Sequence, residues 1–482
     1  MKNSEKYEVV IGLEVHAQLL TRSKLFCGDS IAFGAAPNTQ VSPVSLAHPG
    51  TLPVMNREVI SLAVTLGLAL GCDITRHHYF ARKNYFYPDL PKGYQVSQHT
   101  APVCRAGGID IHTGNTEKHI SLNRIHIEED AGKSIHDMEA DYTCVDLNRA
   151  GTPLLEIVTE PCLSSSEEAF AFLTALRKMV RWLHVCDGNM EEGSMRCDAN
   201  ISIRPVGEKK LGTRVEVKNL NSIRNVKRAI DAEVERLIGI VESGQPVIQQ
   251  TRSFDADKGT TFALRSKEEA DDYRYFPEPD LPPFFISEKH IEAIRAQMPL
   301  LPAATEQLFK NKYGLGDYDA AVICSDKDDA DFYGSIVAET TSYKSAANWM
   351  LGPLKAWCNE QQKAFNELPL NGAQLATLIN FTESGAVSFN TASTKLLQSM
   401  LEKGYKDPAQ LAQEMNLLQE SDAGAIEAWV KEALDSMPDK VKEYKSGKKG
   451  LIGLFAGQVK KISRGKADMQ QATRMLEQQL NQ

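Results

Sequence analysis

Hydrophobic and polar residues alternate strictly along the stretch from Val9 to Leu19, which reads VVIGLEVHAQL. Successive residues of a β-strand point to opposite faces of a sheet, so this alternation predicts a half-buried strand. Its polar face includes Glu14 and His16, whose side chains would project in the same direction about 7 Å apart. Its apolar face, which needs a core to pack against, carries Ile11, Leu13, Val15, Ala17 and Leu19.

The same alternation returns later in the chain, in Ser121–Glu128 (SLNRIHIE), Met195–Pro205 (MRCDANISIRP) and Arg214–Lys218 (RVEVK). A solvated polar face explains one such strand, because antiparallel sheets commonly expose one face to water. Several strands with acids and bases on that face favour a sheet with a charged, concave surface.

Helical patterns are interleaved with these strands, over about Ser166–His184 and Ser222–Ser243. The first of them opens with the run SSSEE, which is a good N-cap signal. Because strands and helices do not alternate regularly, we predict an α+β fold with a mainly antiparallel sheet. The strand signal stops after the proline-rich segment Pro277–Phe285 (PEPDLPPFF), and helical patterns predict an all-α C-terminal half.

Length and charge limit the possible functions. A chain of 482 residues is long enough for about three domains. The formal net charge of -9 argues against general binding to nucleic acids, although it leaves room for a locally basic face. The stretch Lys440–Lys466 is such a face, and either a solvated helix pair or contacts to a phosphate backbone would explain it. Its glycines at 450, 453 and 457 predict close helix packing and a rigid placement.

Cysteine usage and hydropathy bear on the cellular location. The nine cysteines are odd in number, scattered, and contain no CxxC pair, which is typical of free thiols in a reducing cytosol. The N-terminus lacks the apolar core of a signal peptide, and no apolar run is long enough to span a bilayer. We therefore expect a soluble, cytoplasmic protein without a membrane partner.

A buried acid is the clearest candidate for chemistry. Glu156 lies inside the apolar run TPLLEIVTE, where an unpaired carboxylate would cost several kcal/mol. An arginine partner or a divalent cation would satisfy it. Glu14 and His16 share a strand face, and Glu128, Glu129 and Asp130 end the strand RIHIEED. Oxygen-rich sites with one imidazole suit Mg²⁺ or Mn²⁺.

Basic residues accompany these acids. Lys83 lies among tyrosines in ARKNYFYPDLPKGYQ, and Arg196 and Lys218 lie on polar strand faces, where they could bind phosphates. The sequence contains no P-loop, no dinucleotide-binding glycine motif and no nucleophile elbow. If the chain uses a nucleotide, we expect acidic metal ligands on a sheet to hold it.

Several long motifs together resemble a known family, the B subunits of the aspartyl/glutamyl-tRNA amidotransferases. The matching stretches are VIGLEVHAQL, FGAAPNTQVSPVSLAHPGTLPVMN, RKNYFYPDLPKGYQVSQ, IHIEEDAGKS, DLNRAGTPLLEIVTEP, MEEGSMRCDANISIRP, VEVKNLNS and DDYRYFPEPDLPP. They are collinear over residues 9–283. The end of the chain, KSGKKGLIGLFAGQVKKISRGKAD, is similar to the family's YqeY-like tail.

The resemblance implies an activity and partners. In this family, ATP and Mg²⁺ phosphorylate the side-chain carboxylate of Glu-tRNA(Gln) or Asp-tRNA(Asn), a mischarged tRNA. Ammonia made by an amidase, the A subunit, then displaces phosphate, and a small C subunit joins the other two. The N-terminal domain, called the cradle, is distantly like glutamine synthetase. We accordingly expect a cradle at 1–290, a helical domain at 291–370 and a helical tail at 371–482.

The resemblance also suggests roles for individual residues. Glu14, His16, Glu129 and Glu156 match the family's metal-site motifs, and Lys83 is the candidate for contact with the γ-phosphate. The weaker candidates for the nucleotide site are Arg196, Asp198 and Lys218. The expected contacts to tRNA come from basic residues of the tail, namely Lys448, Lys449, Lys460, Lys461 and Arg464.

The sequence departs from the family pattern at one place. Many members carry CxC and CxxC, a set of four thiolates that binds zinc. Here the corresponding stretches are Cys27-Gly28-Asp29 and Ser42-Pro43-Val44-Ser45, which keep one thiol. We therefore expect no structural zinc and a loop held by packing.

Two other functions remain open. A non-catalytic tRNA-binding scaffold for the amidase would not need Glu14, His16, Glu129 and Glu156 together. A free-standing carboxylate–amine ligase for small molecules would not need the basic tail. The sequence leaves open whether Glu-tRNA, Asp-tRNA or both are the substrate.

Overall fold

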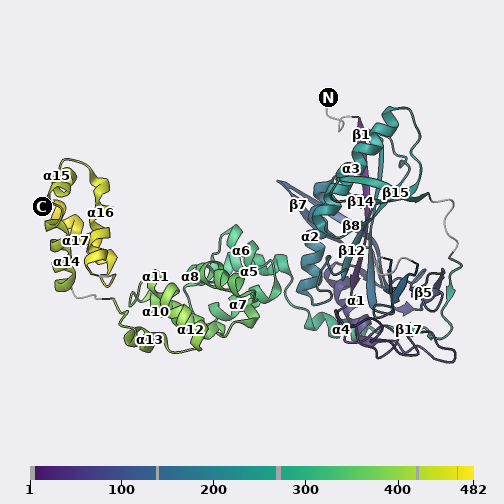
Figure 1. Ribbon diagram of the computed structural model, residues 1–482, viewed down its shortest axis with the longest axis horizontal. Helices are drawn as coiled ribbons and strands as arrows, with labels where there is room; N and C mark the ends of the chain where they lie inside the picture. The colour runs from purple at the N-terminus through teal and green to yellow at the C-terminus, as the bar shows by residue number, and fades with distance from the viewer. Residues whose placement is uncertain (1–5, 137–140, 267–272, 420–422, 464, 482) are drawn as a thin grey trace. The chain divides into compact units, whose positions relative to one another are not determined.

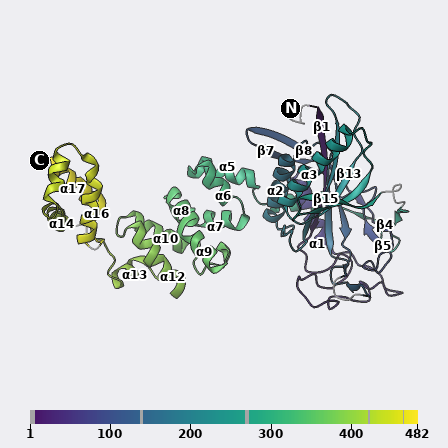
Figure 2. The ribbon, with the colours of Figure 1, turned by 45° about the horizontal axis from the view of Figure 1, so that its top comes forward.

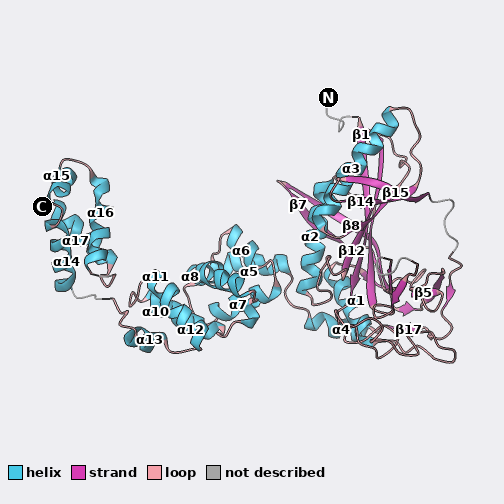
Figure 3. Cartoon of the chain, viewed as in Figure 1, coloured by secondary structure: helices cyan, strands magenta, loops and turns pink. Residues whose placement is uncertain are grey.

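The computed structural model describes residues 6–136, 141–266, 273–419, 423–463 and 465–481, and two compact units divide the chain at residues 301 and 302. Strands occur in the first unit, and the described part of the second is helical (Figure 3). This confirms the predicted mixed α+β fold with a helical C-terminal half. The predicted division into three domains stays a prediction.

The first unit is built on a large sheet, which contains ten strands within the described residues (Figure 1). Neighbouring strands follow the order β15-β14-β13-β12-β1-β11-β8-β6-β2, and β7 pairs with β8. Every pair is antiparallel except β13 with β14. The strands are β1 (Tyr7–Gln18), β2 (Asp73–Ile74), β6 (Cys104–Arg105), β7 (Gly108–Thr113), β8 (Thr116–Glu129), β11 (Pro153–Thr159), β12 (Met195–Pro205), β13 (Val215–Leu220), β14 (Gln250–Asp255) and β15 (Thr260–Ser266).

Two helices cover one face of this sheet. Helices α2 (Ser166–Trp182) and α3 (Ile223–Glu242) lie side by side and contact the sheet through β7, β12, β13 and β15 (Figure 2). The side chains of Ser165 and Ser222 cap these helices, because they accept hydrogen bonds from the backbone N–H groups of Glu168 and Asn225. The predicted apolar face of β1 is at most 1% exposed from Ile11 to Leu19. The alternation therefore identified the core face correctly, and the polar face is left for chemistry.

Smaller elements complete the first unit. A second sheet has the order β16-β4-β5, with β4 (Ala81–Asn84), β5 (Tyr94–Ser97) and β16 (Phe276–Pro277). Two pairs of short strands are β9 (Lys133–Ile135) with β10 (Cys144–Asp146) and β3 (His77–His78) with β17 (Phe284–Phe285). Helices α1 (Arg57–Ala69) and α4 (Glu288–Gln297) contact each other.

The proline-rich segment, which the sequence marked as a boundary, belongs to the first unit. β16 pairs with β4, and β17 pairs with β3, so the segment folds back onto strands that lie far earlier in the chain. The buried Glu278 carboxylate accepts two hydrogen bonds from Arg82, from Nε at 2.8 Å and Nη2 at 2.7 Å. This bidentate ion pair fixes β4 between its neighbours.

The described part of the second unit is helical. Its helices are α5 (Pro302–Tyr313), α6 (Asp317–Ile323), α7 (Lys327–Val337), α8 (Tyr343–Trp349), α9 (Lys355–Gln361), α10 (Gly372–Glu383), α11 (Phe389–Thr391), α12 (Leu397–Lys403), α13 (Pro408–Glu414), α14 (Ala423–Asp435), α15 (Pro438–Lys445), α16 (Ile452–Ile462) and α17 (Met469–Asn481). The last four share a hydrophobic core built around Val430, Phe455 and Leu476. No helix among the described residues is long and apolar enough to cross a membrane.

Candidate active site

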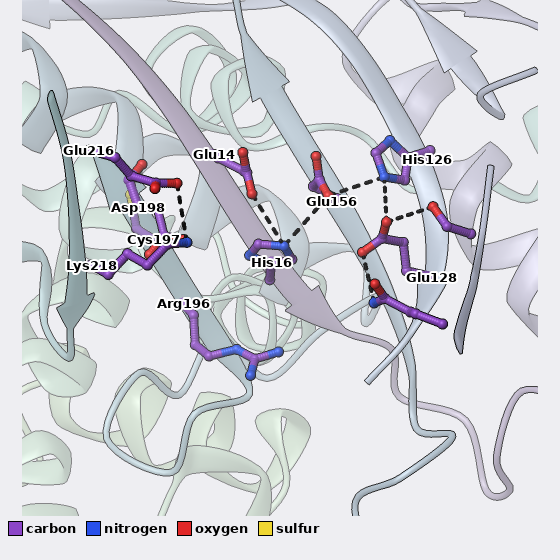
Figure 4. A network of polar contacts seen from close by, with 12 residues as sticks. Glu14, His16, His126, Glu128, Glu156, Arg196, Cys197, Asp198, Glu216 and Lys218 are labelled. Carbon is purple, nitrogen blue, oxygen red and sulfur yellow. Dashed lines mark hydrogen bonds and ion pairs between the residues drawn. The ribbon is translucent and has the colours of Figure 1, made fainter. Parts of the chain in front are cut away.

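Antiparallel pairing brings a row of acids and imidazoles together on the polar face of the large sheet. His16 on β1 lies opposite Glu156 on β11, and Glu156 lies opposite His126 on β8. On the other side of β1, His16 lies opposite Arg196 on β12. Directly opposed residues of neighbouring strands point to the same face, with Cβ atoms about 5 Å apart. The register of β8, β11, β1 and β12 thus aligns these side chains in one polar row, most of which Figure 4 shows.

Glu156 is the centre of this row. Its Oε2 atom lies 3.1 Å from His126 Nε2 and 3.6 Å from His16 Nε2, and its Oε1 atom lies 3.8 Å from Arg124 Nη2. His16 Nε2 also lies 3.7 Å from Glu14 Oε1 (Figure 4). The sequence indicated two ways to satisfy this buried carboxylate, an arginine or a divalent cation. In the structure, two imidazoles are its nearer partners.

Glu128 extends the row on β8. It accepts hydrogen bonds from Ser97 Oγ (2.6 Å), His126 Nε2 (2.9 Å) and Gln95 Nε2 (3.1 Å). Ser97 and Gln95 belong to β5, so the smaller sheet supports this carboxylate. Glu128 is 3% exposed, and these three hydrogen bonds hold its carboxylate in one position.

The proximity of these groups shifts their pKa values. Burial alone would lower the pKa of His126, but the Glu156 and Glu128 carboxylates raise it to about 10. Burial would raise the pKa of Glu156, yet its contacts with His126 and His16 hold it well below the usual range. Burial and the nearby Glu156 raise the pKa of Glu14. The carboxylates of the row thus raise the pKa of both neighbouring imidazoles, His16 and His126.

Basic side chains line the same cavity, which has a volume of about 650 Å³. Burial would lower the pKa of Lys83, but Glu128 and other acidic groups raise it, so Lys83 is a cation there. Lys218 Nζ lies 2.5 Å from Asp198 Oδ2, and Arg196 Nη2 lies 2.8 Å from Asp130 Oδ2. The structure therefore brings together the sequence candidates Glu14, His16, Lys83, Glu156, Arg196, Asp198 and Lys218.

The donor set fits a hard divalent cation. Among the residues that the structure describes, two groups have ligand atoms within 4.8 Å of one another, namely Glu14 with His16 and Glu156, and His126 with Glu128 and Glu156. Carboxylate oxygens with an imidazole bind hard cations such as Mg²⁺ or Mn²⁺ better than they bind softer metals. Glu156 belongs to both groups, so a cation at either one would contact the centre of the row.

Glu129 does not join this cluster, although the sequence named it as a metal ligand. Its Oε1 atom accepts from the backbone N–H of Val96 (2.8 Å), and its Oε2 atom lies 2.5 Å from Lys92 Nζ. Strand side chains alternate, so only one of two consecutive acids can face the row, and here it is Glu128. Sequence reasoning also missed His126. The signal was available, because His126 and Glu128 are two residues apart, as Glu14 and His16 are.

Comparisons with known proteins cover most of the chain. Residues 9–292 match the model of the GatB/GatE catalytic domain, and residues 331–480 match that of the GatB domain. The chain is 48% identical over 477 residues to the B subunit of the aspartyl/glutamyl-tRNA(Asn/Gln) amidotransferase of Syntrophotalea carbinolica, covering 99% of each chain. It is 47% identical over 481 residues to the protein of the same name from Bordetella pertussis, covering 98% of this chain and 99% of the relative.

The chain belongs to the family of aspartyl/glutamyl-tRNA(Asn/Gln) amidotransferase B subunits. All the acids of the row lie within the residues that match the catalytic domain of this family. The strands that align the row therefore lie in the part of the chain that matches the catalytic domain.

The residues at the family's zinc position do not fit zinc in this chain. Asp29 Oδ2 accepts from the backbone N–H of Ser42 (2.9 Å), from Cys27 Sγ (3.2 Å) and from Ser45 Oγ. One thiol, one carboxylate and two hydroxyls are not the four nitrogen or sulfur ligands of a structural zinc site. Hydrogen bonds to Asp29 join the two loops instead, and the absence of zinc stays a prediction.

The tail lysines lie on the surface of the last four helices. Lys448, Lys449, Lys460 and Lys461 are exposed, whereas Arg464 lies outside the described residues. The glycines at 450, 453 and 457 predicted close packing, but a Cβ atom at any of them would meet nothing within 4 Å. That interpretation was wrong, because these glycines face open space.

Glu128 and Glu129 offer a matched test of the metal site. We expect Glu128→Gln to weaken Mn²⁺ binding at least about tenfold, because it removes a charged oxygen that the cation would contact. Glu129→Gln should change the affinity less than about threefold, since this side chain points away from the row. Titration of the full chain with Mn²⁺, followed by electron paramagnetic resonance, measures both. Equal losses in the two variants would contradict the assignment.

Proposed function

We propose that this chain activates a carboxylate on a mischarged tRNA. ATP transfers its γ-phosphoryl group to the side-chain carboxylate of Glu-tRNA(Gln), Asp-tRNA(Asn) or both, giving an acyl phosphate and ADP. Ammonia then attacks the acyl carbon and releases inorganic phosphate, which leaves an amide. The observation that carries this proposal is the convergence of Glu14, His16, Glu128, Glu156 and Lys83 in one cavity.

The basic side chains of the cavity have the charge that phosphate transfer requires. Phosphoryl transfer depends mainly on positioning and on neutralising phosphate oxygens. Lys83 is a cation on the cavity wall, and its Nζ atom lies 5.0 Å from the centre of the Tyr273 ring. We assign it the contact with the γ-phosphate. Arg196 and Lys218 also line the cavity, and each has an acidic partner.

The acids are suited to hold Mg²⁺ rather than to contact phosphate directly, because carboxylates and phosphate repel each other. Glu156 would hold the ion together with Glu14 and His16, or together with His126 and Glu128, and the bound ion would supply positive charge to the phosphate oxygens. Glutamine synthetase activates a glutamate carboxylate in the same chemical way, and a distant likeness of the cradle to that enzyme forms part of this proposal.

The relatives are named as B subunits, which supports assembly of this chain with an amidase, the A subunit, together with a small C subunit. The amidase would supply ammonia, since we identified no activated serine or cysteine nucleophile in the sequence. The exposed lysines of the tail would contact the tRNA backbone.

A lysine substitution tests whether this chain is the kinase. We expect Lys83→Met to lower tRNA-dependent ADP release by about a hundredfold, the usual loss when one group that stabilises transition-state charge is removed. The affinity for tRNA should stay nearly unchanged. ADP release by the assembled complex with Glu-tRNA(Gln) or Asp-tRNA(Asn) is the measurement.

Lys118→Met is the matched control for this test, because Lys118 forms its ion pair with Glu168, at the N-terminal end of α2, and does not line the cavity. It should leave ADP release unchanged. If Lys83→Met also released ADP at the normal rate, the chain would instead be the non-catalytic tRNA-binding scaffold.

The exposed lysines of the tail lead to a separate prediction about tRNA affinity. Replacing Lys448, Lys449, Lys460 and Lys461 with Gln should weaken tRNA binding. It should also flatten the salt dependence, by about one unit of slope for each phosphate that is no longer neutralised. ATP affinity should stay unchanged. Binding titrations at several salt concentrations measure this effect.

A control variant removes the same total charge from the first unit. It changes four exposed lysines to Gln, namely Lys209, Lys210, Lys258 and Lys289. An identical affinity and salt slope in the tail variant and the unmodified chain would show that the tail is only a solvated group of helices.

A further inference from the structure

A row of aromatic rings begins at the wall of the active-site cavity. The ring of Tyr85 lies 5.9 Å from that of Tyr87 and 6.2 Å from that of Tyr273, both edge-to-face. Tyr273 continues to Tyr275 at 6.0 Å, and Tyr275 stacks on His99 at 4.0 Å with an angle of 10° between the rings. Five rings from two distant parts of the chain are therefore in contact. Of these, Tyr85 lines the cavity.

Tyr85 is presented next to the phosphate-binding candidate Lys83. The two residues are separated by one position at the end of β4, and both line the cavity. In extended backbone, this separation is about 7 Å. Lys83 lies directly opposite Gln95 on β5 in the strand register, and Gln95 donates a hydrogen bond to Glu128. Lys83 and Gln95 therefore both face Glu128. A cation and an aromatic ring thus lie side by side on one wall.

The backbone that carries this pair is held firmly. Arg82 contacts both the planar Glu278 carboxylate and the Tyr94 ring, with its guanidinium carbon 4.1 Å from the ring centre. Asn84 Nδ2 donates to the carbonyl groups of Tyr273 (3.1 Å) and Arg274 (2.9 Å). The Asn84 contacts fasten β4 to the segment that supplies the supporting rings. Tyr85 is therefore a pre-positioned surface.

A nucleotide combines the two features that this wall can recognise. An aromatic ring stacks on the face of a base, and a neighbouring cation binds its phosphate. Simple packing would also bring tyrosines together, but it does not require one of them to line a cavity beside a lysine. Both nucleotides that the proposed reaction brings to this cavity carry adenine, in ATP and in the 3′-terminal adenosine of tRNA.

We propose that Tyr85, supported by Tyr87 and Tyr273, is a stacking surface for an adenine ring in the active-site cavity. This inference rests on the proposed function, because that function brings adenine nucleotides to the cavity. It adds a base-binding residue to a site otherwise described by its acids and cations. Since stacking needs the ring and not the hydroxyl group, phenylalanine should replace Tyr85 without loss.

Three probes of the assembled complex distinguish the sources of the adenine ring. ADP and inorganic tripolyphosphate, each with Mg²⁺, are compared by calorimetry, because only ADP carries a base. A tRNA with 2-aminopurine at its 3′ end reports stacking of the terminal base by fluorescence quenching. The variants are Tyr85→Leu, Tyr85→Phe and, as a control, Phe262→Leu, which alters a 49% exposed ring on β15 at one edge of the large sheet.

We expect Tyr85→Leu to weaken the binding of one of the two adenine probes by about tenfold to a hundredfold. If that probe is the modified tRNA, its fluorescence quenching should also be lost. The probe that responds identifies which adenine is bound. Tripolyphosphate affinity should stay the same, and Tyr85→Phe and Phe262→Leu should resemble the unmodified chain. If Tyr85→Leu does not fold, Tyr85→Gln serves in its place.

Two results would overturn the inference. One is an unchanged affinity for ADP together with unchanged quenching of the tRNA probe in Tyr85→Leu. The other is an equal loss of ADP and tripolyphosphate affinity, which would mean that the cavity as a whole had been disturbed. Neither result would affect the proposed function, which depends on Lys83 and on tRNA-dependent ADP release.

Discussion

The buried carboxylate of Glu156 is the constraint on which the active site depends. It sits in the middle of a hydrophobic strand, with β1 on one side and β8 on the other. Leaving such a group unpaired would destabilise the fold by about 3–5 kcal/mol. His16 and His126 prevent this from the two neighbouring strands. The register of three strands is therefore tied to one charge, and the same register aligns Glu14 and Glu128 beside it.

A second wall of the cavity has a different origin. It comes from the small sheet of β4, β5 and β16, which supplies Lys83 and Gln95. The Arg82–Glu278 ion pair holds this sheet together across 196 residues of chain. The large sheet thus carries the acids and imidazoles together with Arg196 and Lys218, and the small sheet carries Lys83 next to aromatic rings.

The sequence predicted the part of this arrangement that is local. Alternation identified β1, β12 and the polar face that carries Glu14 and His16, because the two-residue period of a strand can be read without knowing its neighbours. Strand order cannot be read in this way. The pairing of β16 with β4 joins short segments that are distant in sequence, and no local pattern marks it. Glu128 shows the same limit, because the family resemblance pointed to Glu129, and no local pattern says which of these two glutamates faces the cavity. The register of β8 against β11 decides it, since Glu156 opposes His126 and residues of the same parity share that face.

In our proposal, the substrate carboxylate is phosphorylated at the row around Glu156, and trapping the acyl phosphate tests this most directly. The assembled complex is incubated with ATP, Mg²⁺ and Glu-tRNA(Gln) or Asp-tRNA(Asn), without an ammonia source and with hydroxylamine, and the hydroxamate formed on the tRNA is measured. We predict hydroxamate from the unmodified chain and none above background from a Glu156→Gln variant that still binds tRNA. Normal hydroxamate formation by Glu156→Gln would contradict the proposal.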